Sequence, residues 1–94
     1  MNVIAGLKPI TVDLRGGGAD PVGPSEDVPL RLDVVYELRC DNPVHVLAGG
    51  GDNVTARNLQ VRPDTPILFR ADVEQMRIAA ASASATAWLR EVTR

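Results

Sequence analysis

The chain has 94 residues, enough for a single domain over residues 1–94 with one core, and too few for an enzyme with a separate cofactor-binding domain. Its three aromatic residues require an aliphatic core, while eight glycines and seven prolines indicate many turns. Ten basic and twelve acidic side chains give a net charge of −2, and the basic residues are scattered, which argues against a nucleic-acid partner. No apolar stretch reaches the roughly 18 residues that a membrane span requires.

The first predicted strand carries an alternating apolar pattern. Ile10, Val12 and Leu14 share one face of a strand that the chain enters through Pro9. The following residues 15–29, RGGGADPVGPSEDVP, contain four glycines and three prolines, so we expect neither a helix nor a central strand there. We predict a long loop or arm, a kind of segment that in small domains is usually functional or disordered.

Residues 30–38 form the clearest predicted strand. Apolar side chains take every second position and mostly charged ones the positions between; with the residue at 28 included, the apolar set is Val28, Leu30, Leu32, Val34, Tyr36 and Leu38. This alternation is typical of a strand with one face on a core and the other in water. The Asp-Asn-Pro sequence at 41–43 predicts a turn, and residues 44–47 predict a short strand after it.

Turn signals and short apolar segments continue through the middle of the chain. Residues 49–53 predict a turn, residues 59–61 a short strand, residues 62–66 another turn and residues 67–69 a further strand. Strand signals at intervals of about 8–12 residues are typical of sandwiches and barrels. The sequence therefore predicts an all-β fold, a small single-domain β-sandwich or barrel, Greek-key or jelly-roll-like, with about seven to eight short strands.

The last third of the sequence fits two structures. Residues 71–87 have good helix propensity and an apolar helical stripe. They also fit a strand with Met76, Ile78 and Ala80 on one face, a small-residue turn, and a second strand over residues 85–92. Alternating serine and alanine is a poor choice for a helix, and the other short strands need partners, so we favour the hairpin of two strands.

Side chains that could carry chemistry are few. His45 is the sole histidine and Cys40 the sole cysteine, so neither a zinc site nor a Cys–His dyad with a third group can be assembled, and we expect both to be packing residues of strands. The triple glycines at 16–18 and 49–51 lack the context and ending of phosphate-binding loops. We predict no catalytic residue, no cofactor and no metal, and we expect Trp88 in the core.

Seven short motifs follow one another after the strand that begins at residue 30. They are DNPVHV at 41–46, Gly51, VTA at 54–56, VRP at 61–63, ILF at 67–69, IAA at 78–80 and ATAWL at 85–89. Their order resembles that of a family of small tailed-bacteriophage virion proteins, with the match running from residue 30 to residue 92. The glycine usual in the family's last hairpin turn is replaced here by Ala83-Ser84.

The resemblance implies a compact, non-enzymatic β-sandwich carried on phage particles. It implies a capsid decoration (cement) protein that binds and stabilises the head shell, made in the host cytoplasm and placed on the virion surface. Its partners would be the major capsid protein or other virion proteins, with self-association as a trimer at a capsid local threefold axis. A neck or tail protein, a small β-sandwich module that binds a sugar or host receptor, and an enzyme accessory subunit are the alternatives.

The residues expected to contact such partners lie in the predicted arm and in the turn after residue 53. Backbone ordering costs about 1–2 kcal/mol per residue, so an arm that becomes ordered on a partner must bury apolar groups such as Val22 and Val28. The contact residues that we expect are Arg15, Gly16, Asp20, Val22, Pro24, Val28, Arg57 and Asn58. Neither nucleic acid nor a membrane is expected as a partner.

Overall fold

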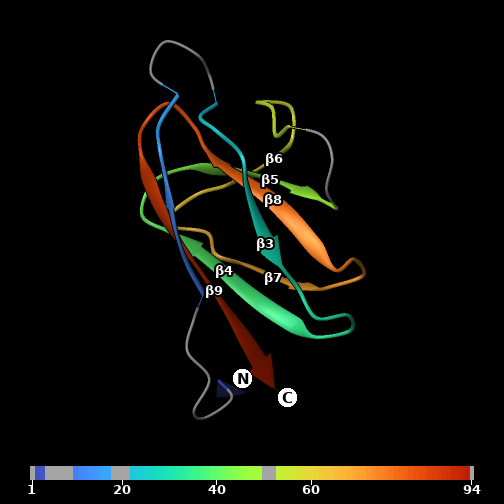
Figure 1. Ribbon diagram of the computed structural model, residues 1–94. Coiled ribbons are helices and arrows are strands. Elements are labelled where there is room, and N and C mark those ends of the chain that lie inside the picture. The colour runs from blue at the N-terminus through green and yellow to red at the C-terminus, as the bar shows by residue number, and fades with distance from the viewer. Residues whose placement is uncertain (1, 4–9, 18–21, 50–52, 94) are drawn as a thin grey trace.

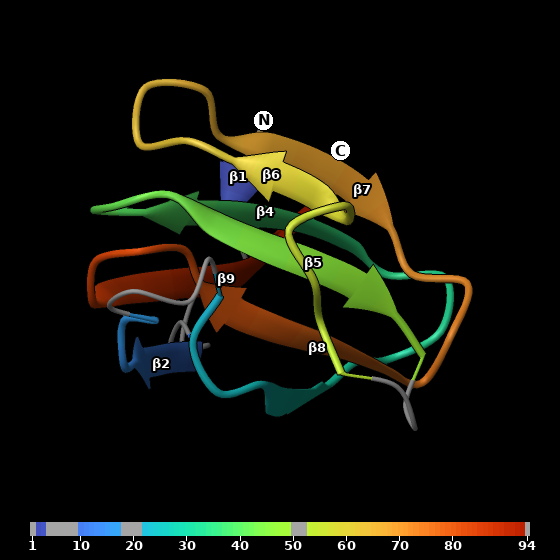
Figure 2. The same ribbon diagram turned by 90° about the horizontal axis from the view of Figure 1, so that it is seen from above.

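The computed structural model describes residues 2–3, 10–17, 22–49 and 53–93 and folds them into two stacked antiparallel sheets (Figure 1). Figure 2 shows β5, β6 and β8 in one layer and β4 and β9 in the other. The described strands are β1 (Asn2–Val3), β2 (Ile10–Leu14), β3 (Glu26–Pro29), β4 (Val35–Cys40), β5 (Val44–Ala48), β6 (Leu59–Val61), β7 (Ile67–Arg70), β8 (Gln75–Ala80) and β9 (Ala85–Thr93). The prediction of a small all-β sandwich is confirmed.

The first sheet is built around β9, its longest strand. Its order is β1-β9-β4-β7, and β2 also pairs with β9, on the part of the strand that β1 leaves free. On the other side, β4 pairs with β9 over six consecutive positions, from Val35↔Val92 to Cys40↔Ala87. The pairing Asn2↔Thr93 places the two ends of the chain side by side, as Figure 1 also shows.

The second sheet has the order β3-β8-β5-β6. β8 lies between β3 and β5, so both of its edges are hydrogen-bonded, and β6 forms the outer edge beyond β5. Six of the connections between successive described strands, from β3 to β4 and from β8 to β9 among them, join strands of different sheets. Strands that follow each other in sequence therefore mostly face each other across the core.

The core between the sheets is aliphatic, as the composition requires. Its fully buried large side chains are Val28, Leu38, Val44, Val61, Ile78 and Leu89, each less than 2% exposed or at that limit. Alanines at the inward positions of β8 and β9 let the two sheets approach closely. The rings of Tyr36 and Phe69 stack with their centroids 5.7 Å apart, which adds the single aromatic pair found among the described residues.

The predicted strand over residues 30–38 is wrong in its first half. Residues 26–29 form β3 in the second sheet, whereas β4 begins at Val35 in the first sheet. The chain changes sheets between them through a loop in which Asp33 has a φ of 64°. Leu30 stays buried beside the core, but Leu32 is 51% exposed. The apolar alternation persists across the loop because strands of both sheets face the same core.

The predicted arm over residues 15–29 is also shorter than expected, because its last four residues belong to β3. In the last third, the two expected strands are present as β8 and β9, in place of the alternative helix. They do not form a hairpin, since β8 belongs to the second sheet and β9 to the first. Residues 81–84 instead arch over the end of the core, where Ala81 donates its backbone N–H to the carbonyl of Pro43 at 3.0 Å.

Candidate interaction site

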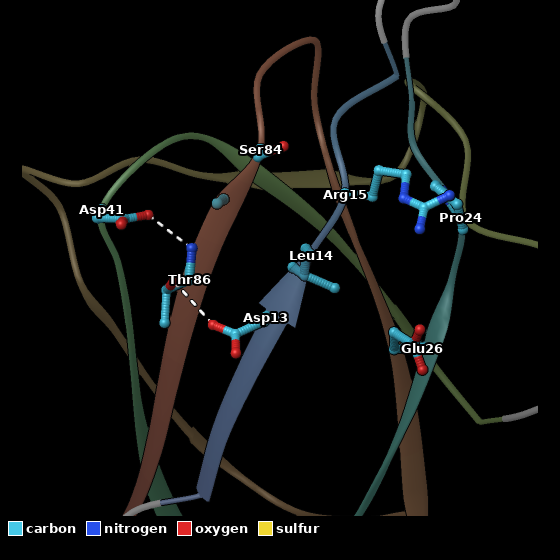
Figure 3. Close-up of a pocket in the computed structure, with 9 residues that line it drawn as sticks. Asp13, Leu14, Arg15, Pro24, Glu26, Asp41, Ser84 and Thr86 are labelled. Atoms are coloured by element: carbon cyan, nitrogen blue, oxygen red, sulfur yellow. Dashed lines mark hydrogen bonds between the residues drawn. The ribbon is translucent and has the colours of Figure 1, made fainter.

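A cleft of about 740 Å³ opens at the end of the sandwich where β2, β9 and the start of the predicted arm meet. Figure 3 shows Asp13, Asp41 and Thr86 on one side of it, with Arg15, Pro24 and Glu26 across from them. Its lining residues are Asp13, Leu14, Arg15, Pro24, Glu26, Asp41, Ser84, Ala85 and Thr86. Three carboxylates and one guanidinium make this a polar, open cleft.

Thr86 positions the carboxylates of Asp13 and Asp41, which together with Thr86 form the first wall of the cleft. Its backbone N–H donates to Oδ1 of Asp41 at 2.6 Å, and its hydroxyl donates to Oδ1 of Asp13 at 3.1 Å (Figure 3). The positions follow from the sheet, because Asp13 pairs directly with Thr86 and Asp41 directly follows β4. An ionised carboxylate accepts several hydrogen bonds, so both groups keep acceptor capacity toward the cleft.

The second wall is held by backbone contacts that only glycine permits. A Cβ atom on Gly23 would lie 1.9 Å from the carbonyl oxygen of Arg15, and one on Gly16 would lie 2.6 Å from the backbone nitrogen of Ser84. Gly23 and Gly17 donate their N–H groups to the carbonyls of Ala80 and Ala81 at 2.9 and 3.0 Å. We call the described residues 15–17 and 22–25 the strap. Both ends of the strap are fastened to the end of β8.

The structure brings together three of the eight expected contact residues. Arg15 and Pro24 line the cleft, and Gly16 lies beside them where its N–H donates to Oγ of Ser84 at 3.0 Å. Val22 is half-buried in the strap. Asp20 lies outside the described residues.

The other expected contact residues lie elsewhere in the fold. Val28 is 1% exposed between the sheets, so it is a core side chain rather than a surface contact. Arg57 and Asn58 lie in the turn before β6 and do not line the cleft, although Val54 in the same loop donates its backbone N–H to Oγ of Ser25 in the strap at 2.9 Å. The side-chain oxygen Oδ1 of Asn58 accepts a hydrogen bond from the backbone N–H of Thr55 at 2.7 Å. The backbone carbonyl oxygen of Asn58 is hydrogen-bonded to Nδ1 of His45 at 3.0 Å. Asn58 thus organises the turn and holds the histidine.

Cys40 and His45 pack as the sequence predicts. His45 is 6% exposed in β5. Cys40 is a buried free cysteine whose thiol lies 3.5 Å from the carbonyl oxygen of Val61. Burial, and secondarily the nearby Asp41 charge, raises the pKa of the Cys40 thiol above its ordinary value of 9.0. A raised pKa lowers the thiolate fraction, so this cysteine has the character of a packing residue.

Trp88, which we expect in the core, lies instead on the outer face of the first sheet and is 38% exposed. Beside it is a hollow of about 390 Å³ lined by Arg39, Cys40, Pro63, Trp88 and Arg90. The alternation within β9 does indicate this position, because Ala85, Ala87 and Leu89 occupy the inward set. The expected core position is therefore wrong, because Trp88 lies on the strand face opposite the buried Ala85, Ala87 and Leu89.

Neither metal ligation nor a transmembrane helix is found in the part of the chain that the structure describes. No group of three or more His, Cys, Asp or Glu side chains there could hold a metal ion. None of those residues belongs to a helix long and apolar enough to cross a membrane. Comparisons with protein-family models, with curated proteins and with solved structures each returned no match.

Proposed function

We propose that this protein is a non-enzymatic structural component of a bacteriophage particle. It is a decoration protein that docks on the capsid through the cleft beside the strap. The observation that carries the docking role is the cleft itself, an open polar surface whose two walls are held in place by Thr86 and by the glycines of the strap. The phage context is supported by the order of motifs from residue 41 to residue 89.

The chemistry of the cleft favours a protein surface as its partner. Asp13, Asp41 and Glu26 offer acceptors to basic side chains or backbone N–H groups, and Arg15 offers a planar donor to a carboxylate. Preformed walls reduce the entropy that docking would otherwise cost. A small domain of this kind can occur in many copies on a shell, with each copy adding contacts between capsid subunits.

Mass spectrometry of particles purified from the host that encodes this chain tests the proposal. Hundreds of copies per particle support a decoration protein, whereas six or twelve copies place it at the neck or tail. Absence from the particles would end the virion proposal, and the genes adjacent to this one would then point to a bacterial binding module or accessory subunit.

A binding assay separates the cleft from the rest of the surface. Particles stripped of the protein are mixed with the folded chain and pelleted. The variant Arg15→Glu should bind about tenfold more weakly or worse, because reversing a charge at a docking surface creates like-charge contacts. The matched control Arg70→Glu makes the same change at an exposed position of β7, which pairs with Val35 at the opposite end of β4 from Asp41, and it should bind as the unaltered chain does. Equal binding by both variants would exclude docking through the cleft.

A further inference from the structure

The outer face of β4 and β9 carries four side chains in a square. In the antiparallel pairing, Arg39 lies opposite Trp88 and Glu37 lies opposite Arg90. The two rows are separated by two residues along each strand, or about 6.8 Å. Figure 1 shows the two strands side by side. We call these four residues the square.

Within the square, Glu37 is bound much more closely by Arg90 than by Arg39. Arg90 donates to Oε1 of Glu37 from Nη2 at 2.6 Å and from Nε at 2.7 Å, and the Glu37 side chain is only 13% exposed. Arg39 reaches the same oxygen only at 3.9 Å, and its side chain is 57% exposed. The square therefore presents a loosely held guanidinium and an exposed indole next to a tightly held ion pair.

A two-fold rotation makes this surface complementary to itself. Let the axis lie in the plane of the face, run across the strands and pass midway between the two rows. The rotation then places β4 over β4 and β9 over β9 and exchanges the rows, so that Arg39 of one copy faces Glu37 of the second copy. It places Trp88 over Arg90 of the second copy. Each contact occurs twice, as an isologous interface requires.

We propose that the outer face of the first sheet is a self-association surface, on which two copies of this chain form an isologous dimer through the square. The two contact types are an Arg–carboxylate pair and a guanidinium stacked on an indole, both suited to arginine at interfaces. Glu37 gains a second guanidinium in place of the long intrachain contact. Trp88 and the exposed Leu68, which pairs with Glu37 on the β7 side, lose water contact together.

The size of the face fixes the strength to be expected. The outward positions number two in β2, three in β4, two in β7 and three or four in β9. At a strand spacing of about 4.8 Å and about 6.8 Å between successive outward residues, they give a face of about 350 Å² per copy. About 700 Å² for both copies lies below the range of stable specific interfaces, so we expect weak association, with a Kd of about 0.1–1 mM. An acidic position inside the square disfavours a phosphate backbone as the occupant, since Glu37 would repel it.

Sedimentation velocity of the full chain from about 1 µM to about 1 mM tests the dimer directly. We expect a reversible monomer–dimer equilibrium. Trp88 is the only tryptophan, so its emission should shift to the blue and become less accessible to acrylamide over the same concentration range. A monomer with constant emission throughout overturns the proposal, and so does a trimer, the state that the resemblance implies.

Charge reversal identifies the contact. Arg39→Glu places two carboxylates against each other in the dimer, and Glu37→Arg places two guanidinium groups there, so each variant alone should associate at least about tenfold more weakly. Mixed together, the two variants restore both opposite-charge contacts, and a heterodimer of about the original affinity should form. Failure of the mixture to associate overturns the assignment of the square.

Two controls separate loss of the dimer contact from a general effect of charge or of stability. Arg57→Glu carries the same charge change on the second sheet and should associate as the unaltered chain does. If Glu37→Arg lowers stability through loss of the Arg90 ion pair, Arg39→Glu and the tryptophan emission of the unaltered chain still decide the question. The inference does not rest on the phage proposal, because it concerns the isolated chain in solution and can fail or hold whether or not particles contain the protein.

Discussion

The hydroxyl of Tyr36 accepts a hydrogen bond from the backbone N–H of Arg31 at a distance of 2.8 Å. Tyr36 belongs to β4 and is 3% exposed, while Arg31 lies in the loop through which the chain leaves the second sheet for the first. The ring of Tyr36 also stacks on Phe69. One buried side chain thus fastens the sheet-changing loop to the core.

Replacing that hydroxyl should weaken the fold measurably. Tyr36→Phe keeps the ring and its stacking on Phe69 but leaves the N–H of Arg31 without its acceptor, so the free energy of unfolding should fall by about 1–2 kcal/mol. Chemical denaturation measures the change. The control Arg31→Lys keeps the backbone bond and a positive charge beside Glu91, whose side chain is 12% exposed, and it should cost no more than about 0.5 kcal/mol.

Glycine is required in the strap for steric reasons. Gly23→Ala would place a methyl group 1.9 Å from the backbone oxygen of Arg15, so the strap must move and the cleft must change shape. We expect a loss of more than about 2 kcal/mol of stability. Gly49→Ala is the comparison: its φ is +82° and its Cβ meets nothing within 4 Å, so the cost should be only about 1 kcal/mol. Equal costs in thermal unfolding would argue against the close contact at Gly23.

Two leucines on opposite faces of the first sheet should differ strongly in how much they contribute to the free energy of unfolding. Leu38 is 1% exposed between the sheets, and Leu38→Ala should destabilise the protein by about 2–5 kcal/mol through lost burial and a cavity. Leu68 is 50% exposed on the outer face, and Leu68→Ala should change stability by no more than about 0.5 kcal/mol. Urea denaturation at low protein concentration, where the dimer is dissociated, separates the two. Similar losses would mean that the faces are assigned the wrong way round.

Cys40 should make stability depend on alkaline pH. Its folded-state pKa is raised above 9.0, so above that pH the unfolded chain loses the thiol proton while the folded chain still retains it. The stabilising contribution is therefore complete below pH 9.0 and is lost as the pH rises through the folded-state pKa, with a slope of at most about 1.4 kcal/mol per pH unit.

The matched measurement for Cys40 uses Cys40→Ala. Both proteins are unfolded in urea from neutral to strongly alkaline pH, under reducing conditions. The difference between their unfolding free energies should be constant below pH 9.0 and shrink above it. A difference that stays constant through the whole range would contradict the raised pKa.

The strands were largely predictable, and their assignment to sheets was not. Alternation located β2, β4 and β9 because each of these has one face on the core and the other largely toward solvent. It also located β5 and β8, although His45 and Ala79 on their outward face are buried as well. The same alternation cannot register a change of sheet, since Val28 and Tyr36 face one core from opposite sides. A hairpin and an arch between sheets have the same local pattern, which is why the connection from β8 to β9 was predicted wrongly.

The cleft was half predictable. Glycine and proline content marked the strap, and Arg15, Gly16 and Pro24 do meet there. The opposite wall comes from Asp41 and Thr86, which are distant in sequence and are joined by two hydrogen bonds. The N–H of Thr86 donates to Oδ1 of Asp41 at 2.6 Å, and the N–H of Asp41 donates to the carbonyl of Thr86 at 3.1 Å. No local pattern connects those two residues. The square on β4 and β9 was missed for the same reason, because it depends on the register Arg39↔Trp88.

By itself, the sequence determined the class of fold, the aliphatic core, the places where the chain turns and the packing roles of His45 and Cys40. Those properties depend on composition and on period-two burial, which are local. Only the tertiary structure decided which strand lies in which sheet, the outward position of Trp88, and the meeting of the strap with Thr86. The reason is that pairing register and sheet membership are set by contacts between residues distant in sequence. An apolar side chain can be buried in the single core equally well from a strand of either sheet.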